Sequence, residues 1–194
     1  MVTTIIMLVM AYLIGSLSSA IIVCKIMKLP DPRTQGSGNP GATNVLRIGG
    51  KIPAIITLVG DVLKGFIPVL IGHFLGIHAF MLGIIGVAAI LGHILPVFFK
   101  FEGGRGVATT FGAFLALSPI VGLVAIVVWL VVALITRYSS LAALAAVVAA
   151  PITALVTGQL VYLFPILIMS GILVWRHLEN IQRLKSGTES KITF

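Results

Sequence analysis

Long apolar runs alternate with short polar intervals along the whole chain. The apolar runs cover residues 4–24, 53–72, 79–99, 107–136, 141–157 and 160–175. Most of them approach the roughly 20 residues that an α-helix needs to cross a bilayer. Because a bilayer offers no hydrogen-bond partners to exposed backbone groups, runs of this length favour helices, whose backbone bonds are all internal. The pattern therefore predicts a bundle of membrane-spanning helices.

The run at 107–136 is interrupted by Ser118 and Pro119. It fits either one long helix or a hairpin whose first arm has only about a dozen residues. The hairpin places every Lys and Arg except Lys64, which lies within a span, on one side of the membrane, as expected for cytoplasmic loops. We therefore predict an all-α polytopic integral membrane protein. It has seven transmembrane helices, an external N-terminus, a cytoplasmic C-terminus and a single domain over residues 1–194.

Composition excludes a soluble globular domain. Charged residues make up 9% of the chain and hydrophobic residues 59%, whereas ordinary domains carry roughly 25% charged residues. In a membrane protein the net charge of +8 favours loops that meet anionic headgroups or an anionic substrate, and we expect no nucleic-acid partner. The N-terminus lacks the basic region of a cleaved signal peptide, so we expect the first run to be retained.

The longest polar interval follows the first run, at residues 35–47. It combines three glycines, four small polar side chains and one arginine, namely Gly36, Gly38, Gly41, Ser37, Asn39, Thr43, Asn44 and Arg47. Successive backbone N–H groups in glycine-rich turns form anion-binding nests, and an arginine fork matches the oxygens of a phosphate. The interval therefore predicts an anion site, and a flexible connector between two helices is the simpler alternative.

Two ionisable residues lie inside the second run. Asp61 and Lys64 are spaced i and i+3, which places them on one face of a helix. Charges at membrane depth are costly, so they are expected to face the interior of the bundle and to mark a functional site. A structural ion pair that locks two helices is the alternative.

A second polar interval follows the third run, which has His93 near its end. It contains Gly103, Gly104, Arg105 and Gly106, and Thr109 follows in the next apolar run. Glycine N–H groups at the start of a helix, with a cation beside them, have the physical form of a phosphate site. The spacing is not that of a Walker A loop. A second glycine-rich basic interval on the same side as the first strengthens the prediction of an anion site.

The C-terminal segment begins with His177, Glu179 and Asn180, directly after the last run. If the last helix continues, His177 and Asn180 are neighbours at i and i+3. A histidine at the level of the lipid headgroups is the alternative for His177. The predicted topology puts this segment and both glycine-rich intervals at one membrane face. Together they predict a site for a phosphorylated anion at the cytoplasmic interface.

Carboxylates are few in these clusters, and none is paired at the spacing of metal ligands, so we expect no metal and no cofactor. Neither a Gly-x-Ser-x-Gly elbow nor an ordered Ser-His-Asp set is present. A transporter for a phosphorylated anion would place its site near the midplane. The clustering at one face instead favours a reaction between a water-soluble anion and a lipid-soluble partner, with a structural subunit as a further alternative.

Several motifs carry a resemblance that extends over essentially the whole chain. They are GSGNPGATNVLR at 36–47, GDVLKG at 60–65, GH at 92–93, PVFFKFEGGRGVAT at 96–109, HLENIQR at 177–183 and GTE at 187–189. Together they resemble the acyl-phosphate-dependent glycerol-3-phosphate acyltransferases of bacterial membranes. One position departs from that family, which commonly has lysine where this chain has Arg105. Arginine keeps the positive charge, but its planar guanidinium with several N–H donors replaces the single ammonium group of lysine.

The resemblance implies transfer of an acyl group from acyl phosphate to the C1 hydroxyl of sn-glycerol 3-phosphate. The products are lysophosphatidic acid and phosphate, and this is the first acylation of phospholipid synthesis. The substrate hydroxyl is the nucleophile, so no covalent acyl-enzyme is expected. The resemblance also implies catalytic roles for Ser37, Arg47, His177 and Asn180. We expect substrate or phosphate contacts from Gly36, Gly38, Asn39, Gly41, Thr43, Asn44, Lys64, His93, Gly103, Gly104, Arg105, Gly106 and Thr109, and supporting roles for Asp61, Glu179 and Glu189.

The same resemblance implies a multi-pass protein of the bacterial cytoplasmic (inner) membrane with an active site that faces the cytoplasm. Its expected partners are acyl phosphate, glycerol 3-phosphate, membrane lipid and an upstream enzyme that forms acyl phosphate. The base that accepts the proton of the C1 hydroxyl stays open between His177, His93 and the departing phosphate.

Overall fold

The computed structural model describes residues 1–192, and every regular element in that range is a helix. The elements are α1 (Val2–Gly15), α2 (Ser19–Ile26), α3 (Ala42–Gly49), α4 (Lys51–Phe74), α5 (Ala79–Ile94), η1 (Val97–Phe99), α6 (Val107–Leu117), α7 (Pro119–Thr136), α8 (Ser139–Val156), α9 (Leu160–Arg176) and α10 (Leu178–Lys185). The all-α prediction is therefore confirmed.

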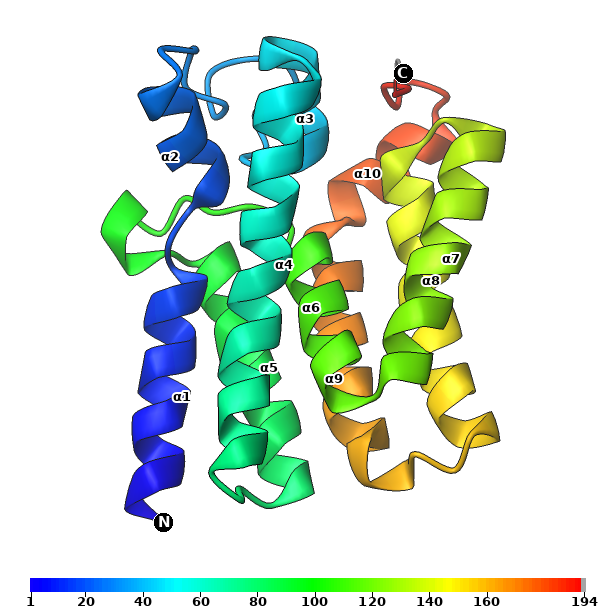
Figure 1. The fold of residues 1–194 in the computed structure, drawn as a ribbon. Coiled ribbons are helices and arrows are strands. Elements are labelled where there is room, and N and C mark those ends of the chain that lie inside the picture. The colour runs from blue at the N-terminus through cyan, green and yellow to red at the C-terminus, as the bar shows by residue number, and fades with distance from the viewer. Residues whose placement is uncertain (193–194) are drawn as a thin grey trace.

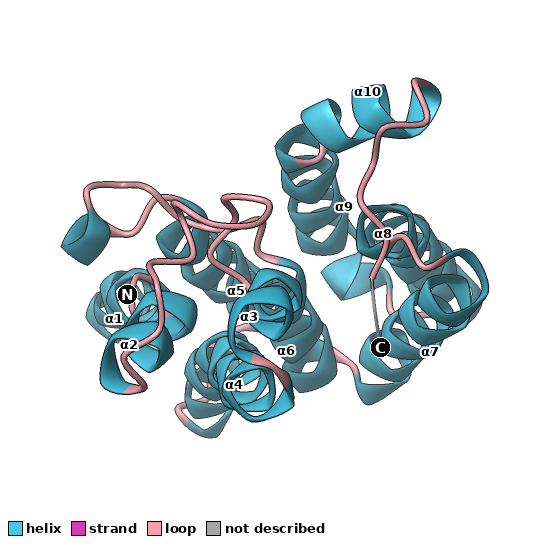
Figure 2. Cartoon of the chain, turned by 90° about the horizontal axis from the view of Figure 1, so that it is seen from above, coloured by secondary structure: helices cyan, strands magenta, loops and turns pink. Residues whose placement is uncertain are grey.

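The helices form two groups that stand side by side (Figure 2). In the first group α4 packs against α6 and α1 packs against α5, and in the second group α7 and α8 pack together. The helix α9 joins the groups because it contacts both α5 and α8. Figure 1 shows the N-terminus at one end of the bundle, and α3 and α10 near the opposite end. The polar segments that follow the first and last apolar runs therefore meet at one end of the molecule.

Length and hydropathy support four membrane spans directly. These are α4, α7, α8 and the segment Ala79–Phe99, which contains α5 and η1. The bent pairs α1 with α2 and α9 with α10 would raise the number to six. The remaining apolar helix, α6, has only 11 residues and begins part-way along the bundle (Figure 1). The count of seven and the orientation in the membrane therefore stay predictions.

The first span is divided, which corrects the prediction of one helix over residues 4–24. The helices α1 and α2 meet at residues 16–18 with a bend of 42°. A break leaves backbone carbonyls without helical partners, and side chains of neighbouring helices can satisfy them. Here Lys64 Nζ, on α4, donates to the Leu17 carbonyl at 3.0 Å. Lys64 therefore stabilises the break from a helix that lies far away in the sequence.

The predicted hairpin is confirmed at Ser118 and Pro119. The helix α6 ends at Leu117 and α7 begins at Pro119, whose fixed φ suits the first turn of a helix. The polar interval at 35–47 is only partly a loop, because α3 begins at Ala42. Thr43, Asn44 and Arg47 therefore lie on a helix, which holds them at fixed spacing.

Glycines let α4 and α6 approach closely. A Cβ atom at Gly65 would overlap the backbone of Thr109, and one at Gly112 would overlap the backbone of Val62. Small residues at such positions are a usual means of packing membrane helices. The contact holds α4, which carries Asp61 and Lys64, against the first turn of α6, directly after the second glycine-rich interval.

Candidate functional site

A cavity of about 740 Å³ lies at the end of the bundle that holds the polar segments. Small-molecule sites typically measure about 300–1,000 Å³. Apolar side chains from α3, α4, α6 and α7 form much of its wall, among them Leu46, Ile55, Leu58, Phe111 and Ile126. Its polar lining includes Ser37, Thr43, Arg47, Arg105, His177 and Asn180. The structure thus brings the three predicted polar clusters together around one cavity, which we call the larger cavity.

The first glycine-rich interval is organised by Asn44. Its amide nitrogen donates to the carbonyls of Pro32 and Gln35 at 2.8 and 2.9 Å, and its Oδ1 accepts from the Ser37 N–H at 2.9 Å. Gly36 has φ +60°, and a Cβ there would overlap Asn44 Oδ1. Asn44 is buried and uses these bonds to shape the loop, which presents Ser37 to the cavity.

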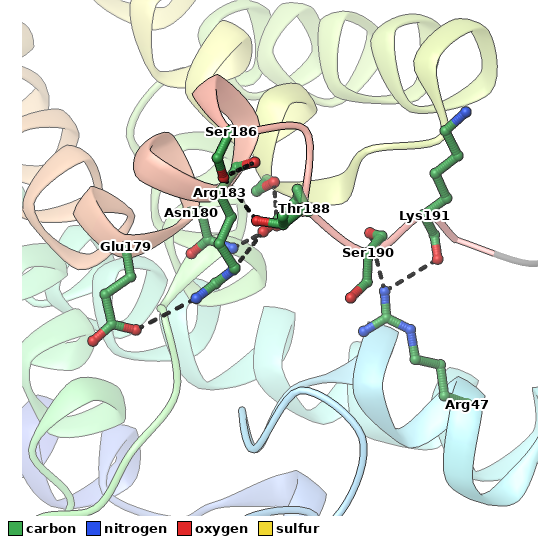
Figure 3. Close-up of polar contacts among 10 residues, drawn as sticks. Arg47, Glu179, Asn180, Arg183, Ser186, Thr188, Ser190 and Lys191 are labelled. Atoms are coloured by element: carbon green, nitrogen blue, oxygen red, sulfur yellow. Dashed lines mark hydrogen bonds and ion pairs between the residues drawn. The ribbon is translucent and has the colours of Figure 1, made fainter.

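Arg47 reaches the C-terminal tail, residues 186–192. Its Nη2 donates to the carbonyls of Ser190 and Lys191 at 3.4 and 3.3 Å, as Figure 3 shows. Arg47 lies on α3 in the first group of helices, whereas the tail follows α10 in the second group. The contact therefore connects the two groups of helices beside the larger cavity, and both Arg47 and Ser190 line that cavity.

Glu189 anchors the tail to the second group of helices. Its Oε1 accepts from Ser140 Oγ and Asn180 Nδ2, both at 2.6 Å, and its Oε2 accepts from Arg183 Nε at 2.8 Å. Burial raises the pKa of Glu189, but the hydrogen bonds from Ser140, Arg183 and Asn180 lower it by more, so the pKa lies below its usual value. Glu189 is therefore an ionised support for the side chains around it.

The tail ends in an apolar contact. The Ile192 N–H donates to the Arg137 carbonyl at 2.7 Å, and the Ile192 side chain is buried in a cluster with Ala133 and Ala142. Trp129, which also lines the larger cavity, packs against this cluster. The tail is thus held by a buried apolar residue as well as by Glu189.

His177 lies at the bend of 55° between α9 and α10, so the last apolar helix does not continue straight into the C-terminal segment. The bend directs α10 across the end of the bundle (Figure 2). His177 is buried, and its Nδ1 lies 2.7 Å from the Leu173 carbonyl. Because a carbonyl oxygen only accepts, Nδ1 carries the proton, and Nε2 of the neutral ring is left as an acceptor.

Asn180 is the third residue of α10 and is also buried. Its amide nitrogen is fixed by Glu189, while its Oδ1 is buried and has no hydrogen-bond partner within residues 1–192. A buried polar atom without a partner is costly. An acceptor in the wall of the larger cavity is therefore available to a donor such as a substrate hydroxyl.

The second glycine-rich interval packs on His93. The Gly104 N–H donates to the His93 carbonyl at 3.2 Å, and a Cβ at Gly104 would overlap the His93 ring. A Cβ at Gly103 would overlap the His93 carbonyl. The other face of the histidine is held by Thr109, whose hydroxyl lies 3.2 Å from Nδ1. The glycines therefore permit an approach that presents Arg105 to the cavity.

Arg105 has no carboxylate partner within residues 1–192. Burial lowers the pKa of its guanidinium, which nevertheless stays protonated because arginine has so high a pKa. Arg105 is half-buried, and a partly desolvated cation without an anion is unfavourable. The position is therefore suited to an anionic ligand.

Asp61 and Lys64 form a buried ion pair. Lys64 Nζ lies 2.9 Å from Asp61 Oδ1, and the Asp61 carboxylate lies 3.8 Å from His93 Nδ1. Asp61 lines the larger cavity, whereas Lys64 does not. With its second contact at the Leu17 carbonyl, Lys64 acts as a structural cation, which favours the ion-pair alternative raised from the sequence.

A smaller cavity of about 400 Å³ adjoins the larger one. Ser37, Asn39 and Arg105 line both cavities, whereas Gly38, Gly103 and Glu179 line only the smaller one. Gly41 and Gly106 line the larger cavity with His93, Asn44 and Glu189. Four residues expected to bind phosphate line neither cavity, namely Gly36, Lys64, Gly104 and Thr109. Each of the four instead supports a neighbour through the contacts described above.

Sequence reasoning missed six polar residues of the two cavities, namely Lys51, Ser139, Ser140, Arg176, Arg183 and Ser190. Ser139 contacts Thr43 at 3.2 Å, and Ser140 contacts Glu189. The adjacent serines at the start of an apolar run were the one available signal. Arg176 and Arg183 lie beside His177 and Asn180 in the sequence, where a positive charge indicates a cytoplasmic segment but does not distinguish a residue that lines a cavity.

These features define a class of protein: a helical membrane protein with an apolar cavity that ends in arginines, a histidine and amides. Such a cavity can hold a lipid-like chain and a phosphorylated group at once. The family model for glycerol-3-phosphate acyltransferases matches residues 5–187. A glycerol-3-phosphate acyltransferase of Coxiella burnetii is 54% identical over 97% of both chains. One of Francisella tularensis subsp. novicida is 55% identical over 95% of this chain and 91% of the relative.

Solved structures agree. The crystal structure of PlsY, an integral membrane glycerol 3-phosphate acyltransferase, in its glycerol 3-phosphate form has a TM-score of 0.93 and 40% identity over 98% of this chain and 96% of that chain. Its lysophosphatidic acid form has a TM-score of 0.91 and 39% identity. The protein therefore belongs to the glycerol-3-phosphate acyltransferase family. It is a multi-pass membrane acyltransferase that serves the acylation of glycerol 3-phosphate in phospholipid synthesis.

Proposed function

We propose that the acyl donor is acyl phosphate and that the products are lysophosphatidic acid and inorganic phosphate. One observation carries this proposal: the larger cavity combines an apolar wall with a polar lining that contains three arginines, Arg47, Arg105 and Arg183. An acyl chain fits the wall and a phosphate fits the arginines. Related crystal structures in a glycerol 3-phosphate form and a lysophosphatidic acid form support the acceptor and the product.

In the proposed reaction the C1 hydroxyl oxygen of glycerol 3-phosphate attacks the carbonyl carbon of the acyl phosphate. A new C–O bond forms, and the bond between that carbon and the phosphate oxygen breaks. The phosphate leaves with the electron pair of the broken bond. The proton of the hydroxyl goes to a base, which is His177 Nε2, His93 or the departing phosphate. No residue of the chain has to form a covalent intermediate.

The residues of the larger cavity supply positioning and charge. Arg47 and Arg105 neutralise phosphate oxygens through charge-assisted hydrogen bonds. Ser37 donates a hydrogen bond to the oxyanion that develops on the carbonyl oxygen. Asn180 Oδ1, which lacks a partner within residues 1–192, accepts from a substrate hydroxyl. Holding both substrates in one cavity then makes the attack effectively unimolecular.

The proposal includes a location. The protein lies in the bacterial cytoplasmic (inner) membrane, and the end of the bundle with α3 and α10 faces the cytoplasm. Support comes from the basic residues, because all except Lys64 lie in the loops and helix ends of that side. Glycerol 3-phosphate then enters from the cytoplasm, and acyl phosphate arrives through the lipid from an enzyme that forms it.

The test is purified protein in detergent with a long-chain acyl phosphate and glycerol 3-phosphate. We expect equal amounts of released phosphate and lysophosphatidate. Ser37→Ala should lower kcat by about 10²–10³, the usual effect of removing one oxyanion donor, and Arg47→Ala should lower kcat/KM at least tenfold. Ser186→Ala, at an exposed serine outside both cavities, is the control. Formation of neither product by the wild-type protein would refute the proposal.

A further inference from the structure

A buried ion pair lies beside the break in the first span. Lys64 Nζ lies 2.9 Å from Asp61 Oδ1 and donates to the Leu17 carbonyl at 3.0 Å. The side chains of Lys64 and Asp61 are 5% and 3% exposed. Both come from α4, whereas Leu17 lies between α1 and α2. Charges at this depth are costly, so a pair that is retained here is expected to serve the function of the protein.

The break that Lys64 stabilises sets the direction of α2. This helix turns away from α1 by 42° and packs on α3 and α4. Ala20 and Cys24 of α2 belong to one buried apolar cluster with Val45 of α3. The direction of α2 therefore constrains α3, the helix that carries Arg47 into the wall of the larger cavity.

Asp61 extends the same network toward the second glycine-rich interval. Its carboxylate lies 3.8 Å from His93 Nδ1, and the Thr109 hydroxyl lies 3.2 Å from the same nitrogen. Both contacts act on the ring against which Gly104 packs, since a Cβ at Gly104 would overlap that ring. Asp61 thus constrains the histidine that supports the interval with Arg105.

The two glycine-rich intervals also meet directly. Arg33, which precedes the first interval, lies 2.9 Å from Glu102, which precedes the second. A Cβ at Gly104 would come within 3.0 Å of the Pro40 carbonyl. The Glu102 side chain is 63% exposed, so its ion pair contributes little. The buried pair inside the bundle is therefore the firmer of the two connections.

We infer that Lys64 and Asp61 are positioning residues for the acyl transfer. Lys64, which lines neither cavity, fixes the break and through it Arg47. Asp61 fixes His93 and through it Arg105. Because a displacement of about 1 Å can slow an enzyme by about 10²-fold, loss of the pair should slow turnover. The inference goes beyond the proposed function, since it applies to transfer of an acyl group from any donor.

Removal of the two charges, singly and together, separates positioning from stability. Lys64→Met and Asp61→Asn each leave one buried charge unpaired, so each should lower the unfolding temperature and lower kcat by roughly 10- to 100-fold. Asp61→Asn/Lys64→Met has no unpaired charge, so its unfolding temperature should return to near that of the wild type. Its kcat should stay low, because methionine cannot donate to the Leu17 carbonyl. The matched control is Lys25→Met, at an exposed lysine of α2, which should keep its kcat.

Recovery of both the unfolding temperature and kcat in the double variant would show that the pair is only structural and would overturn the inference. Lys64→Arg is a second arm, because it keeps both charges even if the double variant does not fold. Its longer, planar head group cannot take the place of the ammonium between the carboxylate and the Leu17 carbonyl. We expect a lower kcat with little change in the unfolding temperature, and a kcat equal to that of the wild type would contradict the inference.

Distances between two nitroxide labels report on positioning without turnover. Cys24→Ser removes the native thiol, and Gln35→Cys and Phe98→Cys place labels at exposed residues beside the two glycine-rich intervals. With Lys64 present, electron paramagnetic resonance should show one narrow distribution of distances. In Lys64→Arg and Lys64→Met the distribution should broaden or shift.

The control pair of labels is Leu75→Cys with Thr157→Cys, at exposed residues that follow α4 and α8 at the other end of the bundle (Figure 1). Its distances should be the same in every protein. Identical distributions for the first pair with and without Lys64 would refute the inference, whichever acyl donor the protein uses. A change of equal size in the control pair would show general unfolding and would also refute it.

Discussion

The carboxylate of Glu189 fixes the positions of several other side chains in the larger cavity. It accepts hydrogen bonds from Ser140, Asn180 and Arg183, which come from α8 and α10. Its own position in the tail places the carbonyls of Ser190 and Lys191 within reach of Arg47. Loss of this one charge should therefore disturb several polar residues of the larger cavity together.

We predict that Glu189→Gln destabilises the protein by about 1–3 kcal/mol at neutral pH. The neutral amide of glutamine would replace a charged carboxylate that accepts hydrogen bonds from three side chains. Because the pKa of Glu189 is lowered in the folded protein, the stabilisation that its charge provides depends on pH. Its contribution is full above the pKa of an unfolded glutamate, near 4.3, and is lost as the pH falls through the lower folded-state pKa. Thermal unfolding in detergent should show the gap between variant and wild type closing at acid pH.

The control for this prediction is Glu179→Gln. The Glu179 side chain is 84% exposed and lies 3.8 Å from Arg183, so its charge should contribute little to stability. An equal loss in both variants, or a gap that does not change with pH, would contradict the role given to Glu189.

Close packing between helices depends on glycines at the points of contact. The backbones of α4 and α6 meet at Gly65 and Gly112, and this contact sets the position of the interval that carries Arg105. We predict that Gly112→Ala lowers stability by about 1–3 kcal/mol, because its Cβ overlaps the Val62 backbone. The control is Gly171→Ala, because Gly171 lies in a helix with open space around it. This substitution should leave the thermal stability unchanged or raise it slightly. Equal behaviour of the two variants would reject the packing role.

Elements whose signals are local could be predicted from the sequence. The apolar runs marked the long helices, and Ser118 with Pro119 marked the hairpin. The break in the first span was missed because the group that stabilises it, Lys64, lies 47 positions from Leu17. Much of the site was anticipated from polar clusters, but the contact of Arg47 with Lys191 joins residues 144 positions apart. No pattern within one segment predicts such contacts.

For the molecule as a whole, orientation in the membrane can be tested by labelling. We predict an external α8–α9 turn and an internal tail, because the turn has no Lys or Arg and the tail region is basic. Cys24 is buried and is the chain's only cysteine, so a Cys24→Ser background allows single cysteines to be introduced. In intact cells a membrane-impermeant maleimide should label Thr157→Cys, and it should label Ser186→Cys only after permeabilisation.

Both test positions are exposed in the structure, so failure to react reports on the membrane and not on burial. Labelling of Ser186→Cys in intact cells with protection of Thr157→Cys would reverse the orientation. Labelling of both would place both segments on the same side and show that α9 does not cross the membrane.

The buried end of the tail has a practical consequence for anyone who handles this protein. Met1 is 98% exposed, whereas Ile192 is 4% exposed and packs with Ala133 and Ala142. An affinity tag or fluorescent reporter fused to the N-terminus leaves the polar end of the bundle untouched. A bulky fusion that pulled Ile192 out of this cluster would draw the segment that meets Arg47 away from the cavity. Purification and imaging are therefore best designed from the amino end.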